Sequence, residues 1–106
     1  MISLEDFKKL ELRIAEIESV TPHPNADRLY VLVVRVGGER KNIVAGIRKH
    51  YGEQELLGKK VVLVANLEPA VIRGVESQGM LLAASEGENL SLIIPERVIG
   101  DGASIR

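Results

Sequence analysis

The stretch from Asn66 to Met80 holds the side chains best suited to gripping a nucleic acid. It reads Asn-Leu-Glu-Pro-Ala-Val-Ile-Arg-Gly-Val-Glu-Ser-Gln-Gly-Met, so it sets a guanidinium (Arg73), a hydroxyl (Ser77) and an amide (Gln78) close together. A guanidinium can hold a phosphate through two parallel N–H bonds, and hydroxyls and amides can bind a ribose 2′-hydroxyl or a base edge. Met80 offers a flexible apolar contact. The chemistry favoured by this stretch is therefore binding of an RNA backbone.

The same residues also have an ordinary structural interpretation. Arg73 could pair with Glu68 or Glu76, Ser77 could close a turn, and Met80 could belong to the core. A loop position raises the odds of a functional role, because binding residues concentrate on loops that a rigid scaffold presents. Since the residue types are common, the stretch by itself leaves both interpretations open.

A second polar stretch, His23-Pro-Asn-Ala-Asp-Arg28, provides few groups for a metal. His23 and Asp27 are two candidate ligands on a proline-containing loop, which is too few for a metal site. We expect instead a turn in which the side chains of Asn25 and Asp27 bond their own backbone.

Catalysis finds little support in the sequence. The chain has two histidines, His23 and His50, and no cysteine. It contains no nucleophile elbow centred on serine, no glycine-rich phosphate loop and no zinc-ligand spacing. We therefore expect a protein that is not an enzyme and that carries no metal or other cofactor.

The charge of the chain points to selective rather than indiscriminate binding of a polyanion. Its formal net charge is −1 at pH 7, yet basic residues cluster at Arg40-Lys41, Arg48-Lys49-His50 and Lys59-Lys60. One basic face would suffice for a limited number of phosphate contacts. Composition alone fits ordinary solvated charges as well.

Aromatic residues are scarce, which argues against a channel for single-stranded DNA or RNA. Such channels stack successive bases on exposed rings. The chain has only Phe7, Tyr30 and Tyr51, of which Tyr30 could lie on the face of a barrel. A folded RNA, recognised by its shape and backbone, fits this composition better.

The hydrophobic pattern predicts strands joined by short turns. In the first strand, which begins at Leu10, the apolar phase slips at Ile17, as in a β-bulge. Gly37-Gly38 indicates a hairpin, and Gly58 indicates the end of a helical turn. The expected elements are a helix over 4–10, strands over 10–20, 29–36, 41–45, 61–65 and 80–84, an additional strand over 90–94, and a loop over 66–78.

This order predicts an all-β fold, namely a five-stranded OB-fold barrel that forms one domain over residues 1–106. A short N-terminal helix, a helical turn between the third and fourth strands and a C-terminal extension complete it; another small barrel or sandwich is the alternative. The ligand loops of such a barrel would be 21–28 and 66–78. The longest apolar run, Leu29–Val34, is too short to cross a membrane, and the N-terminus is no signal peptide, so we expect a cytoplasmic protein.

Several stretches together resemble a known family. They are Asp6-Phe7, Leu12–Ile17, His23–Tyr30, Ile43–Gly46, Glu55–Val61 and Asn66–Met80. The chain resembles the tRNA-binding domain appended to many methionyl-tRNA synthetases and also found free-standing. It is similar, too, to the C-terminal domains of some tyrosyl-tRNA synthetases and to a related cytokine.

The resemblance implies an OB-fold homodimer that binds tRNA by shape, with methionyl-tRNA synthetase as a possible partner and residues 95–106 helping to pair the subunits. Ala45 departs from the family, where a serine is frequent. The alternative is a protein-interaction module that docks a synthetase or scaffold. Carried over by position, the tRNA-binding candidates are Asn66, Arg73, Ser77, Gln78 and Met80, the supporting cations Lys41 and Lys59, and the further candidates Arg28 and Arg35.

Overall fold

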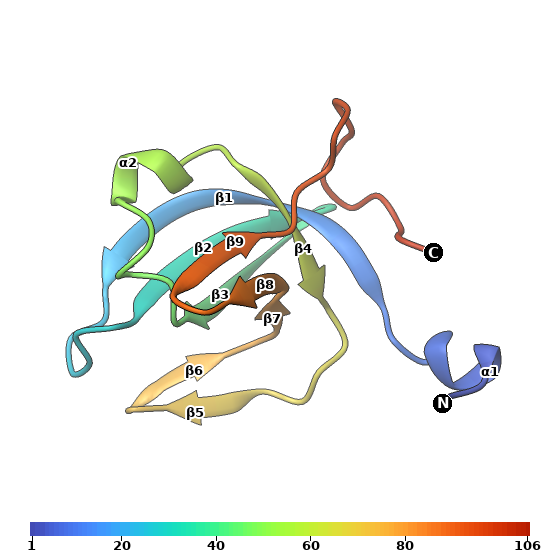
Figure 1. Cartoon of the computed structure of the whole chain (residues 1–106), viewed down its shortest axis with the longest axis horizontal. Helices are drawn as coiled ribbons and strands as arrows, with labels where there is room; N and C mark the ends of the chain where they lie inside the picture. Colours follow the sequence, from blue (N-terminus) through green and yellow to red (C-terminus); the bar gives the residue numbers. More distant parts are fainter.

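The computed structural model describes residues 1–106 and is organised around a curled, five-stranded antiparallel sheet (Figure 1). Neighbouring strands in the sheet follow the order β3-β2-β1-β4-β7. This half-barrel confirms the predicted OB-type fold. The strands are β1 (Leu12–Pro22), β2 (Tyr30–Val36), β3 (Glu39–Ala45), β4 (Lys60–Val64) and β7 (Met80–Leu81).

The long strand β1 bends at the predicted bulge. Its register with β2 shifts between Ile17, which faces Val34, and Ser19, which faces Val33. The first part of β1 pairs with β4 and the second part pairs with β2. The extra residue increases the local twist, which lets one strand serve both sides of a curled sheet.

The core fills the concave side of this sheet. Alternate residues of β2, from Tyr30 to Val36, are buried, as the alternating pattern of a strand with one inner face requires. The short helix α2 (Glu53–Leu56) adds the fully buried Leu56 and is followed by Gly58, whose φ is 79°. Neither α2 nor α1 (Leu4–Phe7) has the length that a bilayer-spanning helix needs.

The region predicted as a loop after β4 holds a hairpin, so this part of the prediction was wrong. Strands β5 (Ala70–Ile72) and β6 (Val75–Ser77) pair around the two-residue turn Arg73-Gly74. Both turn residues have positive φ, the geometry that matches the twist of a two-residue hairpin. Arginine is an unusual residue for such a turn, which is why the sequence did not indicate it.

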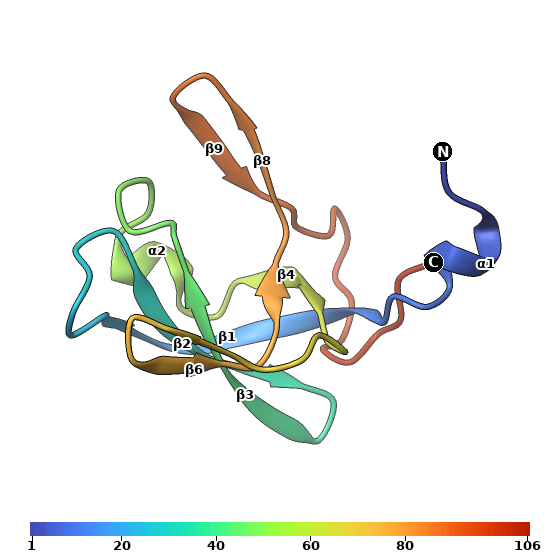
Figure 2. The same cartoon turned by 90° about the horizontal axis from the view of Figure 1, so that it is seen from below.

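The predicted strand over 80–84 is divided between two sheets. Residues 80–81 form β7, whereas β8 (Ala83–Glu86) pairs with β9 (Asn89–Leu92) as a separate ribbon. Figure 2 shows this ribbon projecting away from the barrel. Every residue of β8 is exposed, so the apolar run did not mark one continuous buried strand.

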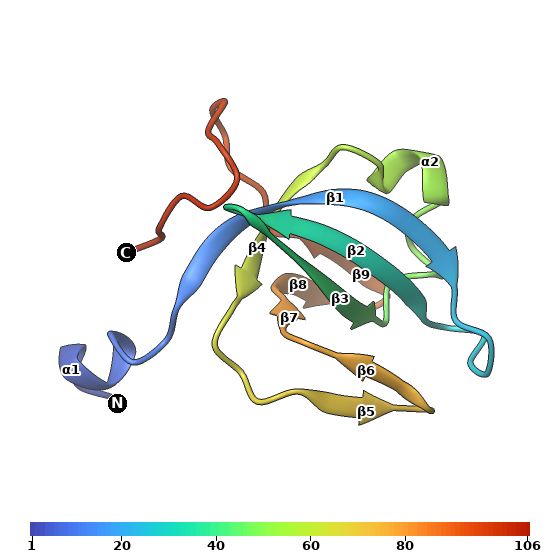
Figure 3. The same ribbon diagram turned by 180° about the vertical axis from the view of Figure 1, so that it is seen from behind.

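The end of the chain lies along β1, on the edge that β2 leaves free (Figure 3). Ile14 exchanges bonds with it: its N–H donates to the carbonyl of Ala103 at 2.9 Å, and its carbonyl accepts from Gly102 at 2.7 Å. A Cβ on Gly102 would lie 2.8 Å from the Cα of Gly37, so only glycine fits this approach to the β2–β3 turn.

Candidate nucleic-acid interface

Ser77 and Gln78 close the barrel between β3 and the segment that leads into β7. The Ser77 hydroxyl accepts from Val44 N–H at 3.0 Å and donates to the carbonyl of Gly79 at 3.1 Å. Gln78 N–H donates to the carbonyl of Asn42, and its side-chain oxygen accepts from Asn42 N–H, both at 2.8 Å. Side chains thus replace part of a backbone ladder, and we call these contacts the seam.

The seam changes the interpretation of Ser77. Ser77 is only 4% exposed, and its hydroxyl both accepts and donates a hydrogen bond within the fold. This geometry favours the other interpretation of Ser77, a turn-closing residue, over a contact with tRNA. Gln78 is half-buried, and its side-chain oxygen is used within the fold.

Met80 follows the seam and stays at the surface. A Cβ on the preceding Gly79 would lie 2.9 Å from the carbonyl of Val64, so glycine is needed there for close backbone approach. Met80 is 49% exposed and borders a cavity of about 200 Å³. Apart from Gly46, the lining is apolar: Val44, Ala45, Ile47, Met80, Leu81, Ala83, Leu90 and Leu92.

Arg73 occupies the exposed tip of the β5–β6 hairpin. Its φ is 51°, a left-handed conformation that costs a residue other than glycine about 1 kcal/mol. Its Nη2 donates to the carbonyl of Asn25 at 3.2 Å, and Asn25 Nδ2 donates to the Arg73 carbonyl at 3.3 Å. Arg73 forms no ion pair with Glu68 or Glu76. The Asn25 side chain therefore bridges two loops, instead of bonding its own backbone as predicted.

Arg73 and Arg28 share a cavity of about 440 Å³ at this end of the barrel. Both residues are exposed, and neither forms an ion pair with a carboxylate. Figures 1 and 2 place the β1–β2 loop and the tip of the β5–β6 hairpin at one end of the molecule, opposite α1. The cavity is lined by Asn25, Ala26, Asp27, Arg28, Leu29 and Arg73.

A third arginine, the half-buried Arg48, is bonded to the β1–β2 loop that lines this cavity. Its backbone N–H donates to the carbonyl of Arg28 at 3.4 Å, and its guanidinium carbon lies 6.0 Å from the centre of the Tyr30 ring. Tyr30 itself is 5% exposed, so the suggestion that its ring lies on the barrel face was wrong. We call Arg28, Arg48 and Arg73 the arginine cluster.

Two predicted residues at the opposite end of the strands are engaged within the fold. Lys41 Nζ donates to the carbonyl of Ala65 at 2.9 Å. The Asn66 side chain accepts from Glu11 N–H at 2.8 Å and donates to the carbonyl of Lys9 at 2.7 Å. Asn66 therefore fastens the N-terminal segment to the end of β4, and it lies apart from the arginine cluster.

Lys59 is half-buried beside α2. Its ammonium lies 5.7 Å from the centre of the Tyr51 ring, within range of a cation–π contact. The backbone carbonyl of Tyr51 accepts from the Tyr30 hydroxyl at 2.7 Å. Lys59 therefore packs on Tyr51, the residue that also bonds Tyr30, and it forms no ion pair with a carboxylate.

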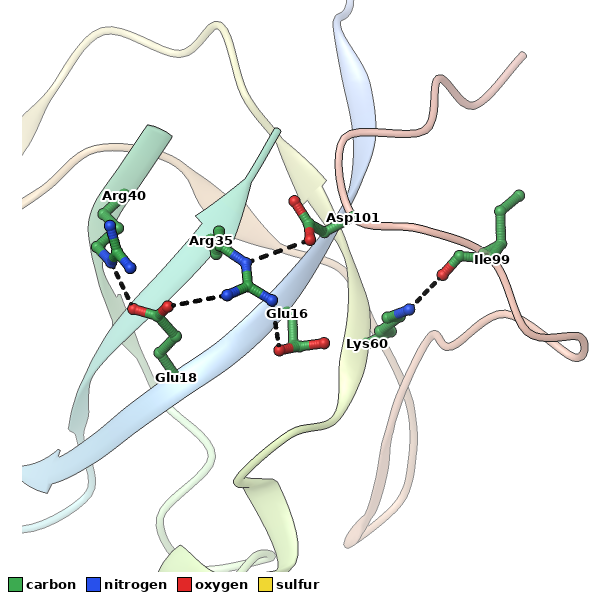
Figure 4. Close-up of polar contacts among 7 residues, drawn as sticks. All are labelled: Glu16, Glu18, Arg35, Arg40, Lys60, Ile99 and Asp101. Atoms are coloured by element: carbon green, nitrogen blue, oxygen red, sulfur yellow. Dashed lines mark hydrogen bonds and ion pairs between the residues drawn. The ribbon is translucent and has the colours of Figure 1, made fainter. Parts of the chain in front are cut away.

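Arg35 is held by three carboxylates, as Figure 4 shows. Its guanidinium bonds Glu16 at 3.0 Å, Asp101 at 3.3 Å and Glu18 at 3.4 Å. Glu18 also accepts from Arg40 Nε at 2.7 Å, and this hydrogen bond is the main reason that the pKa of Glu18 lies below its ordinary value. Three negative charges around Arg35 would repel a phosphate, so the structure gives no support to Arg35 as a tRNA contact.

The comparisons with known proteins identify the family. A family model described as "Putative tRNA binding domain" matches residues 12–104.

This chain belongs to the tRNA-binding domain family.

Relatives of this tRNA-binding domain include synthetases. The chain is 53% identical to methionine–tRNA ligase of Pyrococcus furiosus over 105 residues, which cover 99% of the chain and 14% of the ligase. It is 46% identical over 104 residues to the ligase of Thermotoga maritima, covering 98% of the chain and 16% of that ligase. The chain thus spans only about a seventh of the length of these curated relatives.

Solved structures confirm the fold of the domain. The MetRS related protein from Pyrococcus horikoshii matches with a TM-score of 0.93 and 32% identity, covering 100% of this chain and 98% of that one. The CsaA chaperone protein from Picrophilus torridus matches with a TM-score of 0.93 and 30% identity over the whole of both chains. The resemblance noted from the sequence, to tRNA-binding domains of the methionyl-tRNA synthetase type, is therefore confirmed.

Sequence reasoning missed two residues of the site in this domain, Asn25 and Arg48. Arg48 belongs to a basic run that stood out in the sequence, but nothing there showed that it lies beside Arg28. Asn25 was assigned a local role because asparagine commonly bonds its own loop. Of the predicted candidates, the structure brings Arg28 and Arg73 together.

Proposed function

We propose that this domain binds folded tRNA through the sugar–phosphate backbone, with the arginine cluster as the main contact. The supporting observation is the shared cavity of Arg28 and Arg73, two exposed guanidiniums without carboxylate partners, beside Arg48. Family membership supports tRNA as the polyanion.

The chemistry of the proposed contact is that of backbone binding. Each guanidinium presents planar N–H groups that match two phosphate oxygens. Asp27 lines the same cavity and can accept a hydrogen bond from a ribose 2′-hydroxyl, the group that distinguishes RNA from DNA. Arginines on three different segments require phosphates at fixed separations, so the binding depends on the shape of the RNA and little on its bases. No bond is made or broken.

The proposal extends to a homodimer that acts in the cytoplasm, either in trans or with methionyl-tRNA synthetase. The β8–β9 ribbon is attached to the barrel through Leu90 and Leu92 of β9, whereas every residue of β8 is exposed. An exposed two-stranded ribbon is only marginally stable in water. The segment after it exposes Ile93, Ile94, Val98 and Ile99, of which Val98 is fully exposed. A second copy packed on these residues would cover them and would double the positive charge available to one tRNA.

A second candidate function is docking of another protein. The observation that favours it is the apolar cavity beside the exposed Met80, since flexible methionine suits adaptable protein contacts. Binding of a synthetase that survives ribonuclease and high salt would support this function over tRNA binding.

The deciding experiment compares two charge-matched double variants. Arg28→Gln with Arg73→Gln removes two positive charges from the cluster, and Lys8→Gln with Lys9→Gln removes two at the far end, just after α1. We expect the first pair to weaken tRNA binding at physiological salt by more than tenfold, which is above about 1.4 kcal/mol, and the second pair to leave it near the wild-type value. Equal losses in the two variants would contradict a localised site.

A further inference from the structure

We propose that His23 is a positioning residue that holds the Arg73 hairpin against the β1–β2 loop, so that Arg28 and Arg73 act as one phosphate-binding surface. This inference rests on the function proposed above. It concerns a residue that does not itself reach the ligand, because His23 is only 4% exposed.

The imidazole of His23 is bonded at both ring nitrogens. Nδ1 accepts from the backbone N–H of Asn25 at 2.9 Å, which requires that Nδ1 carries no proton. The proton of the neutral ring therefore lies on Nε2, which donates to the carbonyl of Ile72 at 3.0 Å. One nitrogen shapes the β1–β2 loop and the other reaches the residue just before Arg73.

The bond to Ile72 is better protected than the other links between the two loops. Arg73 and Asn25 are exposed, and their mutual bonds measure 3.2 and 3.3 Å. Water competes with such exposed bonds, whereas the buried imidazole has no alternative partner. The bond from Arg73 to the Asn25 carbonyl uses the same guanidinium that a phosphate would compete for, whereas the His23–Ile72 bond does not involve it. The His23–Ile72 bond then remains to hold the hairpin in place.

This link explains how a strained arginine can keep its position. The left-handed backbone of Arg73 favours escape of the turn to a relaxed conformation. A bond from the neighbouring β1–β2 loop to residue 72 opposes that escape and fixes where the guanidinium points. A group held in place before binding loses less conformational entropy when the ligand arrives.

Two amide substitutions separate the two bonds of the imidazole. In His23→Asn, the side-chain oxygen lies where Nδ1 was and keeps the bond from Asn25 N–H, but the bond to Ile72 is lost. In His23→Gln, the longer side chain brings its NH₂ group to the place of Nε2 and keeps the bond to Ile72. A residue that only shapes its own loop would tolerate Asn better than Gln, which is the reverse of our expectation.

The test measures the dissociation constant for folded tRNA in His23→Asn, His23→Gln, Arg73→Gln and the double variant His23→Asn with Arg73→Gln. We expect His23→Asn to bind about fivefold more weakly and His23→Gln to remain within about twofold of wild type. The double variant should bind no more weakly than Arg73→Gln alone, because His23 acts through Arg73. Thermal unfolding shows that each variant is folded at the temperature of the assay.

Three results would overturn the inference: equal affinities for the two His23 variants, additive losses in the double variant, or a ring proton on Nδ1 in the ¹⁵N spectrum of the free protein. Failure of the proposed function has a different signature, since Arg73→Gln would then bind tRNA normally. If His23→Asn is too unstable to assay, NMR backbone relaxation of the His23→Gln variant still tests whether the bond to Ile72 keeps the hairpin tip ordered. The inference requires its Arg73-Gly74 tip to be as ordered as in wild type, and a mobile tip contradicts it.

Discussion

Arg73 combines a proposed function with a backbone conformation that most residues avoid. Its φ of 51° at the hairpin tip is better suited to asparagine or glycine. Strain of this kind persists where the side chain is needed for another purpose. The residue therefore offers a direct comparison between stability and binding.

We predict that Arg73→Asn stabilises the fold while it weakens tRNA binding. Relief of the left-handed strain should add about 0.5 to 1 kcal/mol to the free energy of unfolding, or several degrees in Tm. Thermal unfolding and a tRNA gel shift on the same preparation check both effects. An unchanged Tm would show that the turn is not strained, and unchanged binding would remove Arg73 from the interface.

Ser77 should behave in the opposite way. We predict that Ser77→Ala lowers the free energy of unfolding by about 1 to 3 kcal/mol, because the buried N–H of Val44 loses its acceptor. Denaturant unfolding measures the loss, and Ser85→Ala, on the exposed strand β8, is the control. A Ser77→Ala protein with wild-type stability but poor tRNA binding would restore Ser77 as a contact.

At the scale of elements, an ion pair and a hydrogen bond attach the tail to the barrel. Asp101 bonds Arg35 on β2, and the carbonyl of Ile99 accepts from Lys60 on β4 (Figure 4). Glu18 joins this network by pairing with Arg40 and Arg35, so protonation of Glu18 would weaken both ion pairs. The network keeps Arg35 and Arg40 paired with carboxylates, whereas Arg28 and Arg73 form no ion pair.

The lowered pKa of Glu18 predicts how this network responds to acid. Because the folded-state pKa lies below the ordinary value, the contribution of Glu18 to stability is present above the unfolded pKa, about 4.3. It is lost as the pH falls through the lower, folded pKa. In Arg40→Gln the main cause of the shift is removed, so the pKa of Glu18 should rise toward its ordinary value. Carboxyl ¹³C titration by NMR checks this, and an unmoved pKa would assign the shift to Arg35 instead.

At the scale of the molecule, a nearly neutral protein must bind a polyanion with few contacts. Three guanidiniums at three phosphates predict a slope of log K against log salt of about −2 to −3 for one protomer. A homodimer that holds one tRNA with both protomers should give about −4 to −6. Sedimentation velocity at each salt concentration supplies the mass. A monomer that gives the steeper slope would contradict the proposal that each protomer contributes three guanidiniums to the contact.

The strands were predictable because their residues carry local signals. The apolar run that becomes β2, the phase slip at Ile17 and the glycines at 37–38 and 58 each follow from the conformation or burial of that same segment. The β5–β6 hairpin and the division of residues 80–84 between two sheets were not predictable in this way. Their strands are short, and their pairing depends on which neighbours the barrel leaves available.

The sequence alone determined the curled sheet, the membership of a tRNA-binding family and the types of side chain near the Asn66–Met80 stretch. Only the tertiary structure decided which of those side chains are free. It committed Ser77 to the seam, Asn66 to the N-terminal segment and Arg35 to three carboxylates, and it brought Arg28 and Arg73 to one cavity. The physical reason is that strand formation depends on neighbours in the chain, whereas the availability of a polar group depends on partners that folding brings from distant segments.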